Sequence, residues 1–140
     1  MINAIKLYRI ANYLYKKKVP IVPKTIKGII FVLYNSSIPY EAIIGKGTIL
    51  GYGGIAVVIH KKAIIGENCT ISQCVTIGGR SKKGVPTIGD NVYIGAGAKI
   101  LGEVTVGSNS IIGANAVVIS DVKEGTVVAG VPAKFIKNKI

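Results

Sequence analysis

The hydrophobic positions of this chain recur at a fixed interval of six residues over most of its length. From residue 88 onward, every sixth position is aliphatic: Ile88, Ile94, Ile100, Val106, Ile112 and Val118. A glycine follows four of these six residues, and a small or β-branched residue lies four positions after each of them. The same interval extends upstream through residues 59–77 and begins with Ile44 and Leu50.

A period of six matches neither an α-helix, which repeats every 3.6 residues, nor a long alternating strand. Short strands joined by tight turns produce such a period, and the glycines supply the backbone freedom that a corner requires. Three hexads then form one triangular coil, and the aliphatic side chains stack into a continuous core. Residues 43–122 therefore predict an all-β domain, a parallel β-helix of about four coils.

The six-residue interval is interrupted twice. Three residues are inserted between Leu50 and Ile59, and five are inserted between Ile77 and Ile88. Grouping the hexads in threes predicts that both insertions border the third face of the first two coils. Loops that project from a rigid repeat scaffold commonly carry binding and catalytic residues, so we expect the functional site there.

The segment before the repeats, residues 1–42, predicts a short helical region. Residues 2–18 have a helical pattern in which one side is broadly apolar: Ile2, Ile5, Ile10, Tyr13 and Leu14. The basic residues Lys6, Arg9 and Lys16 are expected on the other sides. Pro20 and Pro23 end this helix, and residues 24–34 predict a second one.

The charge of the chain is concentrated in this segment. The net charge is +12, and residues 1–40 contain seven Lys and Arg residues but no Asp or Glu. A basic amphipathic helix either packs over the open end of the β-helix, where it covers strand edges, or lies on an anionic membrane surface. Both roles are compatible with one helix.

Composition narrows the classes of fold and function. The chain has 140 residues, which fits one domain, and its 25 Ile, 16 Val and 18 Gly against five Leu exclude a helical bundle. Two cysteines make no disulfide framework, and the absence of a leader pattern predicts a cytoplasmic protein. One histidine and two cysteines are too few for a zinc site, so we expect no metal.

The lone histidine, His60, follows Ile59 at the corner position that glycine usually occupies. Its side chain should therefore point outward and share a column with Gly78, Leu101 and Ile119 of the later coils. A glycine beside the imidazole leaves space for a ligand. Imidazole can take up and release a proton near neutral pH, so His60 is a candidate catalytic base, the alternative being a solvated corner residue.

Four sequence motifs resemble those of the hexapeptide-repeat acetyltransferases, whose solenoid is a left-handed parallel β-helix: VVIHKKAIIGENCTISQCVTIGGR, PTIGDNVYIGAGAKILGEVTVG, IIGANAVVISDV and AGVPAK. The resemblance covers about residues 44–137 and is similar to the serine acetyltransferase branch, most of all to its short members from capsule and O-antigen genes. It implies a homotrimer with acetyl-CoA in the groove between neighbouring solenoids. The C-terminal tail, residues 123–140, carries the AGVPAK motif of the CoA site.

The resemblance also assigns roles to individual residues by position. The sites for the pantetheine arm match small residues: Gly78, Gly79, Ala96 and Ala114. The candidates for the CoA phosphates are basic: Arg80, Lys82, Lys83 and Lys134. A basic loop that is merely solvated is the alternative for these residues.

Two departures from the serine acetyltransferases bear on the acceptor. Those enzymes carry an Asp-His pair directly after the second hexad, where this chain has Gly51 and Tyr52. They carry a further histidine before the loop proline, where this chain has Val85. We therefore expect the acceptor to be a sugar hydroxyl, on a nucleotide sugar or a lipid-linked glycan, with Tyr52 as a candidate acceptor-binding residue near His60.

The expected reaction is direct acetyl transfer in a ternary complex, with His60 as general base. A backbone N–H near Gly78 or Gly79 would hold the oxyanion. Two alternatives remain at this point: serine O-acetylation in cysteine biosynthesis, and a non-catalytic scaffold or nucleic-acid binder. The few aromatic residues and the absence of a recognition helix argue against nucleic acid as a partner.

Overall fold

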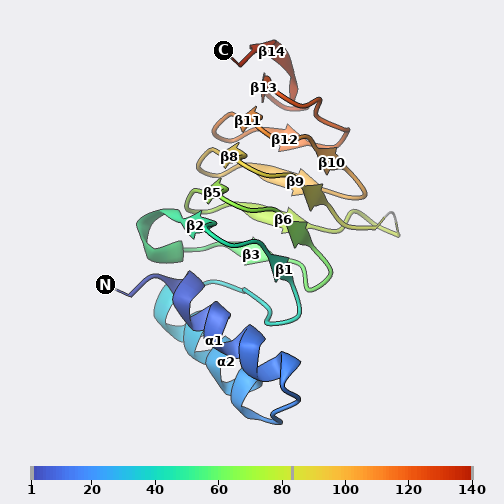
Figure 1. The fold of residues 1–140 in the computed structure, drawn as a ribbon. Helices are drawn as coiled ribbons and strands as arrows, with labels where there is room; N and C mark the ends of the chain where they lie inside the picture. Colours follow the sequence, from blue (N-terminus) through green and yellow to red (C-terminus); the bar gives the residue numbers. More distant parts are fainter. Residues whose placement is uncertain (1, 83, 140) are drawn as a thin grey trace.

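The computed structural model describes residues 2–82 and 84–139. Two helices, α1 (Ala4–Lys16) and α2 (Val22–Tyr34), lie side by side below a stack of short strands (Figure 1). The first two coils consist of β1 (Ile43–Ile44), β2 (Ile49–Leu50), β3 (Val58–Ile59), β4 (Ile64–Ile65), β5 (Thr70–Ile71) and β6 (Thr76–Gly78). The next two consist of β7 (Thr87–Ile88), β8 (Tyr93–Ile94), β9 (Lys99–Leu101), β10 (Thr105–Val106), β11 (Ile111–Ile112) and β12 (Val117–Val118). The chain ends with β13 (Thr126–Ala129) and β14 (Lys134–Asn138).

The strands form three parallel sheets, one for each face of the triangular coil. Their orders are β1-β4-β7-β10, β3-β6-β9-β12 and β2-β5-β8-β11-β13, and β14 adds to the last sheet in the antiparallel direction. The register aligns residues one coil apart, as in the column of Ile59, Ile77 and Ile100. The predicted β-helix of about four coils is therefore confirmed.

The core consists of the stacked aliphatic side chains. In every two-residue strand the second residue is buried, while the first is exposed or half-buried. Each buried Ile or Val side chain stabilises the fold by about 1.5–3 kcal/mol. Cys69 fills one of the small positions inside the coils, where its thiol contacts the carbonyl oxygen of Gly89 at 3.1 Å. Burial raises the pKa of this thiol, so Cys69 is a core residue rather than a nucleophile.

The two insertions both flank the sheet of β3 and β6, as expected. The first contains a short 3₁₀ turn, Gly51–Gly54, between β2 and β3. The second is the loop between β6 and β7, which projects from the side of the solenoid (Figure 1).

Three columns of corner residues run along the solenoid. The first corner follows the strands of the β1 sheet and is formed by Gly45, Gly66, Gly89 and Gly107. The second corner follows the β2 sheet and is formed by Gly51, Ser72, Gly95 and Gly113. The third corner follows the β3 sheet and is formed by His60, Gly78, Leu101 and Ile119.

Helix α1 caps the open end of the first coil. The hydroxyl of Tyr8 donates to the carbonyl of Ala42, and the guanidinium of Arg9 donates to the carbonyls of Ile44 and Gly45. These bonds satisfy backbone groups that have no further strand below them, which is one of the two roles expected for this helix.

The apolar side predicted for this helix is largely wrong, because only Ile5 of its five residues is buried. The buried residues of α1 are Ala4, Ile5, Tyr8 and Ala11. Ile2, Ile10 and Tyr13 are exposed, each by more than half. The strand edge offers carbonyl groups, so the side of the helix that carries the donors Tyr8 and Arg9 lies against it.

Helix α2 begins at Val22, slightly earlier than expected, because a proline is tolerated in the first turn of a helix. Ile30 and Tyr34 are buried against the core. After the helix, Ser37 pairs with Val58, so the chain enters the solenoid directly beneath β3. Within the described residues, neither helix is long and apolar enough to cross a bilayer.

Candidate active site

His60 lies at the start of the third corner, in the first coil. Its backbone N–H donates to the carbonyl of Ile77 at 2.8 Å, which ties this corner to the second coil. Ile59 is buried whereas the His60 side chain is partly exposed, so the imidazole projects outward as expected.

One imidazole nitrogen is already engaged. The backbone N–H of Lys62 donates to Nδ1 of His60 at 3.0 Å. A neutral imidazole has one donor and one acceptor nitrogen, so this contact puts the ring proton on Nε2. In this arrangement Nε2 carries the proton and can only donate a hydrogen bond. Accepting a proton at Nε2 requires that the ring leave Lys62 and carry its proton on Nδ1.

The third corner has space above the histidine. A Cβ added to Gly78 would have as its nearest neighbours Thr76 Cγ2 at 3.7 Å and Leu101 Cδ2 at 3.9 Å. The φ angle of Gly78 lies outside the left-handed region that favours glycine. Neither packing nor backbone conformation within this chain therefore demands a glycine at this position.

A groove continues from this point along the third corner. Its volume is about 440 Å³, and its lining includes Arg80, Lys82, Leu101, Glu103 and Ile119. Leu101 and Ile119 belong to the same column as His60, so the groove follows the corner upward through the third and fourth coils. We call it the third-corner groove; His60 and Gly78 precede it in the same column but do not line it. The structure thus brings His60, Gly78, Arg80 and Lys82 to one edge of the molecule.

Other predicted site residues lie at a different corner. Ala96 and Ala114 follow Gly95 and Gly113 at the second corner, and the carbonyl of Ala96 accepts from Asn115, so the two stack on each other. Tyr52 follows Gly51 at the same corner and is 76% exposed. The strand β3 and the residues before it separate Tyr52 from His60, so one chain does not bring these two residues together.

The motif and the fold have counterparts among known proteins. Residues 86–120 match the family model for the bacterial transferase hexapeptide (six repeats). A serine acetyltransferase from Synechococcus elongatus is 38% identical over 137 residues, which are 96% of this chain and 56% of that protein. One from Staphylococcus xylosus is 40% identical over 139 residues, which are 97% of this chain and 64% of that protein. A crystal structure of serine acetyltransferase from Brucella abortus in complex with coenzyme A has a TM-score of 0.92 and 34% identity, covering 98% of this chain and 56% of that one.

The chain contains the hexapeptide repeat of the bacterial transferases, and the hexapeptide-repeat acetyltransferases are its relatives. It spans 56% to 64% of the length of the relatives named above. The left-handed β-helix expected from the motifs is confirmed by the match to the Brucella abortus structure. These comparisons support the serine acetyltransferase branch and give no support to the capsule and O-antigen enzymes.

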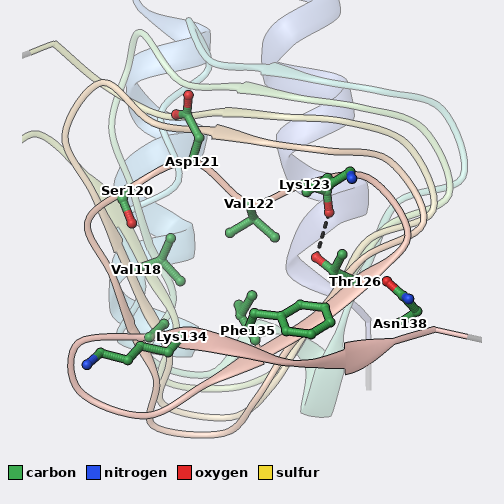
Figure 2. Close-up of a pocket in the computed structure, with 11 residues that line it drawn as sticks. Val118, Ser120, Asp121, Val122, Lys123, Thr126, Lys134, Phe135 and Asn138 are labelled. Carbon is green, nitrogen blue, oxygen red and sulfur yellow. Dashed lines mark hydrogen bonds between the residues drawn. The ribbon is translucent and has the colours of Figure 1, made fainter.

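The end of the AGVPAK motif lines a second hollow, of about 530 Å³, at the far end of the solenoid (Figure 2). Lys134 and Phe135 of β14 line it together with Lys123, whose carbonyl accepts from the hydroxyl of Thr126 at 2.6 Å. Lys134 is therefore not part of the third-corner groove of its own chain. Lys83, another candidate for the CoA phosphates, lies outside the described residues.

An acidic residue near His60 was not identified from the sequence. The register that pairs Ile43 with Ile64 places Glu41 opposite Lys62, one coil below the His60 corner. One carboxylate oxygen of Glu41 is buried without a hydrogen-bond partner among the described residues. Counting back from Lys62 by one coil of 18 residues plus the three inserted residues leads to Glu41, so the repeat itself could have identified this residue. Glu67 is nearer to His60 in the sequence, but the register does not single it out.

The described residues hold no cluster of three or more His, Cys, Asp or Glu side chains that could bind a metal ion. The third corner offers one imidazole, backbone N–H groups and basic side chains.

Proposed function

We propose that this protein transfers an acetyl group from acetyl-CoA to a hydroxyl group of a small acceptor. The observation that carries the proposal is the third corner, where the only histidine lies beside a glycine that the fold itself does not require. The basic residues Arg80 and Lys82 line the third-corner groove, which follows the same corner, and carry the charge that CoA phosphates need. The relative from Brucella abortus, crystallised with coenzyme A, supports the same donor.

In the proposed reaction, Nε2 of His60 takes the proton of the acceptor hydroxyl as its oxygen attacks the thioester carbonyl. A backbone N–H near Gly78 or Gly79 stabilises the tetrahedral oxyanion, a contribution of about 3–4 kcal/mol at such sites. The C–S bond then breaks, and His60 returns the proton to the departing thiolate. The ester and free CoA are the products, so atoms and charge balance without a metal.

This role requires the imidazole to release the N–H of Lys62 when the substrates bind. Hydrogen bonds of catalytic groups often rearrange between the free and the loaded enzyme. With its proton on Nδ1, the ring leaves Nε2 free to accept, and Glu41 below the corner is a candidate partner for Nδ1–H.

The division of the predicted site between two corners supports a homotrimer. The pantetheine candidates Ala96 and Ala114 lie at the second corner, and Gly78 and Gly79 lie at the third. A ligand contacts both sets when the second corner of one copy faces the third corner of its neighbour. Acetyl-CoA would then lie between two copies, with Tyr52 of one chain near His60 of the other.

The acceptor has two candidates. The names of the relatives support L-serine, which reverses the order that we expected from the sequence. A sugar hydroxyl is the second candidate, because Gly51, Tyr52 and Val85 stand where the family's serine enzymes carry acid and imidazole groups. Tyrosine offers a flat apolar ring and a hydroxyl, which suits a sugar.

The test is thiol release from acetyl-CoA with L-serine, a panel of sugars and a panel of nucleotide sugars, using His60→Asn as the matched variant. We expect acceptor-dependent release that falls by about 10²–10⁴-fold in the variant. Full activity in His60→Asn would remove the histidine from the mechanism. Failure of every acceptor to release thiol would contradict the proposed function.

The sequence contains one histidine, so ¹⁵N NMR can identify without ambiguity which imidazole nitrogen carries the proton. We expect the proton on Nε2 in the free protein, as the bond from Lys62 requires. It should move to Nδ1 when CoA and the acceptor are both bound. A proton that stays on Nε2 in the ternary complex would instead make His60 a hydrogen-bond donor to the carbonyl oxygen.

A further inference from the structure

The side of α2 that faces away from the solenoid is apolar and has no partner among the described residues. It consists of Val22, Thr25, Ile29, Val32 and Leu33, which follow one another at helical spacing. Val32 is 79% exposed and Leu33 is 65% exposed. We call this surface the outer face of α2. Its counterpart on the inner side, Ile30 and Tyr34, is buried, so α2 is apolar on both sides.

Two further features extend this surface. Gly28 lies in its middle and leaves a hollow lined by Thr25, Ile29, Val32 and Leu33. Ile21, directly before the helix, is 77% exposed at the tip of a γ-turn in which Val22 donates to the carbonyl of Pro20 at 2.8 Å. The φ angle of Ile21 is +71°, an uncommon conformation for a β-branched residue, and it holds this side chain outside the fold.

The surroundings of the outer face are uniformly basic. Lys24 and Lys27 lie on α2 itself, and Lys16, Lys17 and Lys18 lie at the end of α1 beside the turn. The first acidic residue of the chain is Glu41. An occupant must therefore offer both an apolar interior and negative charge.

We propose that the outer face of α2 docks the protein onto the surface of an anionic lipid bilayer. Apolar side chains enter the boundary between headgroups and acyl chains, while lysines beside them meet the negative headgroups. A second copy of this chain is a poorer occupant, because it would bring the same seven positive charges of residues 1–40 against each other. In this proposal α2 contacts the membrane, whereas α1 caps the solenoid.

This docking would bring the proposed active site close to the bilayer. Ser37, which follows α2, pairs with Val58, two residues before His60. The histidine therefore belongs to the coil nearest the helices, about one strand spacing from the segment that leaves α2. A hydroxyl on a lipid-linked acceptor would reach this end of the solenoid sooner than the other end.

Vesicle co-sedimentation of the full chain tests the proposal. We expect binding to vesicles that contain phosphatidylglycerol, weak binding to pure phosphatidylcholine, and loss of binding as salt rises. Val32→Glu and Leu33→Glu should each weaken binding by about tenfold or more. Ile136→Glu on β14 is the matched control, since Ile136 is 57% exposed at the opposite end of the molecule and the charge change is the same.

Three outcomes would overturn the proposal. One is the absence of wild-type binding to anionic vesicles, and another is equal weakening by the control and the α2 variants. The third is a smaller assembly for Val32→Glu in sedimentation velocity without vesicles, which would make the outer face a contact between copies. Circular dichroism and thiol release keep this test separate from the proposed activity, because neither substituted side chain lies in the third-corner groove.

Discussion

The first and third corners of the solenoid have equivalent positions in the coil but carry different residues. At the first corner, every residue of the column is glycine, and a Cβ added to Gly66 would lie 2.6 Å from the carbonyl carbon of Gly89. At the third corner, the column contains a histidine, a leucine and an isoleucine. Its one glycine, Gly78, has free space around its missing side chain.

This difference separates two reasons for a glycine. At the first corner the coils approach so closely that only glycine fits, which is a requirement of the fold. At the third corner the chain tolerates large side chains, so we infer that the glycine next to His60 serves something outside the chain. In our proposal that is the ligand between two copies.

Substitution of the two glycines gives the largest expected effects. The methyl group added in Gly66→Ala forces the backbones of two neighbouring coils apart. It should lower the free energy of unfolding by about 2–3 kcal/mol. Gly78→Ala should change it by less than about 0.5 kcal/mol. Thermal unfolding at one protein concentration measures both, because assembly would make the transition concentration-dependent.

The activity of the same variants should show the opposite order. Gly78→Val, with a larger side chain, should raise the KM for acetyl-CoA by about tenfold or more, because it fills the space proposed for the pantetheine arm. Gly66→Ala, assayed well below its unfolding temperature, should keep its KM. Equal destabilisation by Gly66→Ala and Gly78→Ala would end the distinction between the two corners.

The basic residues of the two corners give a smaller contrast. Lys82 lies in the third-corner groove, whereas Lys46 is an exposed lysine directly after Gly45 at the first corner. Lys82→Ala should raise the KM for acetyl-CoA by about three- to tenfold with little change in kcat, since a charge-assisted hydrogen bond to phosphate is lost. Steady-state kinetics at low salt measures this. Lys46→Ala should behave as wild type, and an equal rise in both variants would indicate a general effect of charge.

The core and the corners could be predicted from the sequence because they repeat. Each coil imposes the same requirement on its aliphatic positions, so a period of six identifies them before any contact is known. The site is harder to predict, since it depends on breaks in that period. Gly78, Ala96 and Ala114 are spaced like one column of an uninterrupted solenoid, but the five inserted residues place Leu101 above Gly78 and move both alanines to the second corner.

The capping role of the first helix was expected, but its buried side was largely mispredicted for a related reason. Which side of the helix is buried depends on the carbonyl groups at the edge of the first coil. The residue pattern of the helix itself carries no information about those groups. Arg9, expected on the polar side, donates to two of these carbonyls, and Tyr8, absent from the predicted apolar side, is almost fully buried.

Tyr8 gives the smallest expected effect and tests how the first corner is closed from below. Its hydroxyl donates to Ala42, just before β1 and Gly45, so Tyr8→Phe should lower the free energy of unfolding by about 1 kcal/mol at neutral pH. Burial raises the pKa of Tyr8, against the weaker opposing effects of a backbone hydrogen bond and the charge of Arg9.

The pH dependence of this effect follows from the direction of the shift. Below about pH 10, tyrosine is protonated in both the folded and the unfolded chain, so the contribution of Tyr8 is constant. Above that pH the unfolded chain loses the proton first, and the contribution falls until the raised folded pKa is passed. The gap in stability between wild type and Tyr8→Phe should therefore narrow as the pH rises from 9 to about 11. Tyr13→Phe, on the exposed side of the same helix, should show neither the loss at neutral pH nor the narrowing, and a constant gap for Tyr8→Phe would mean that its hydroxyl is not sealed beneath the first coil.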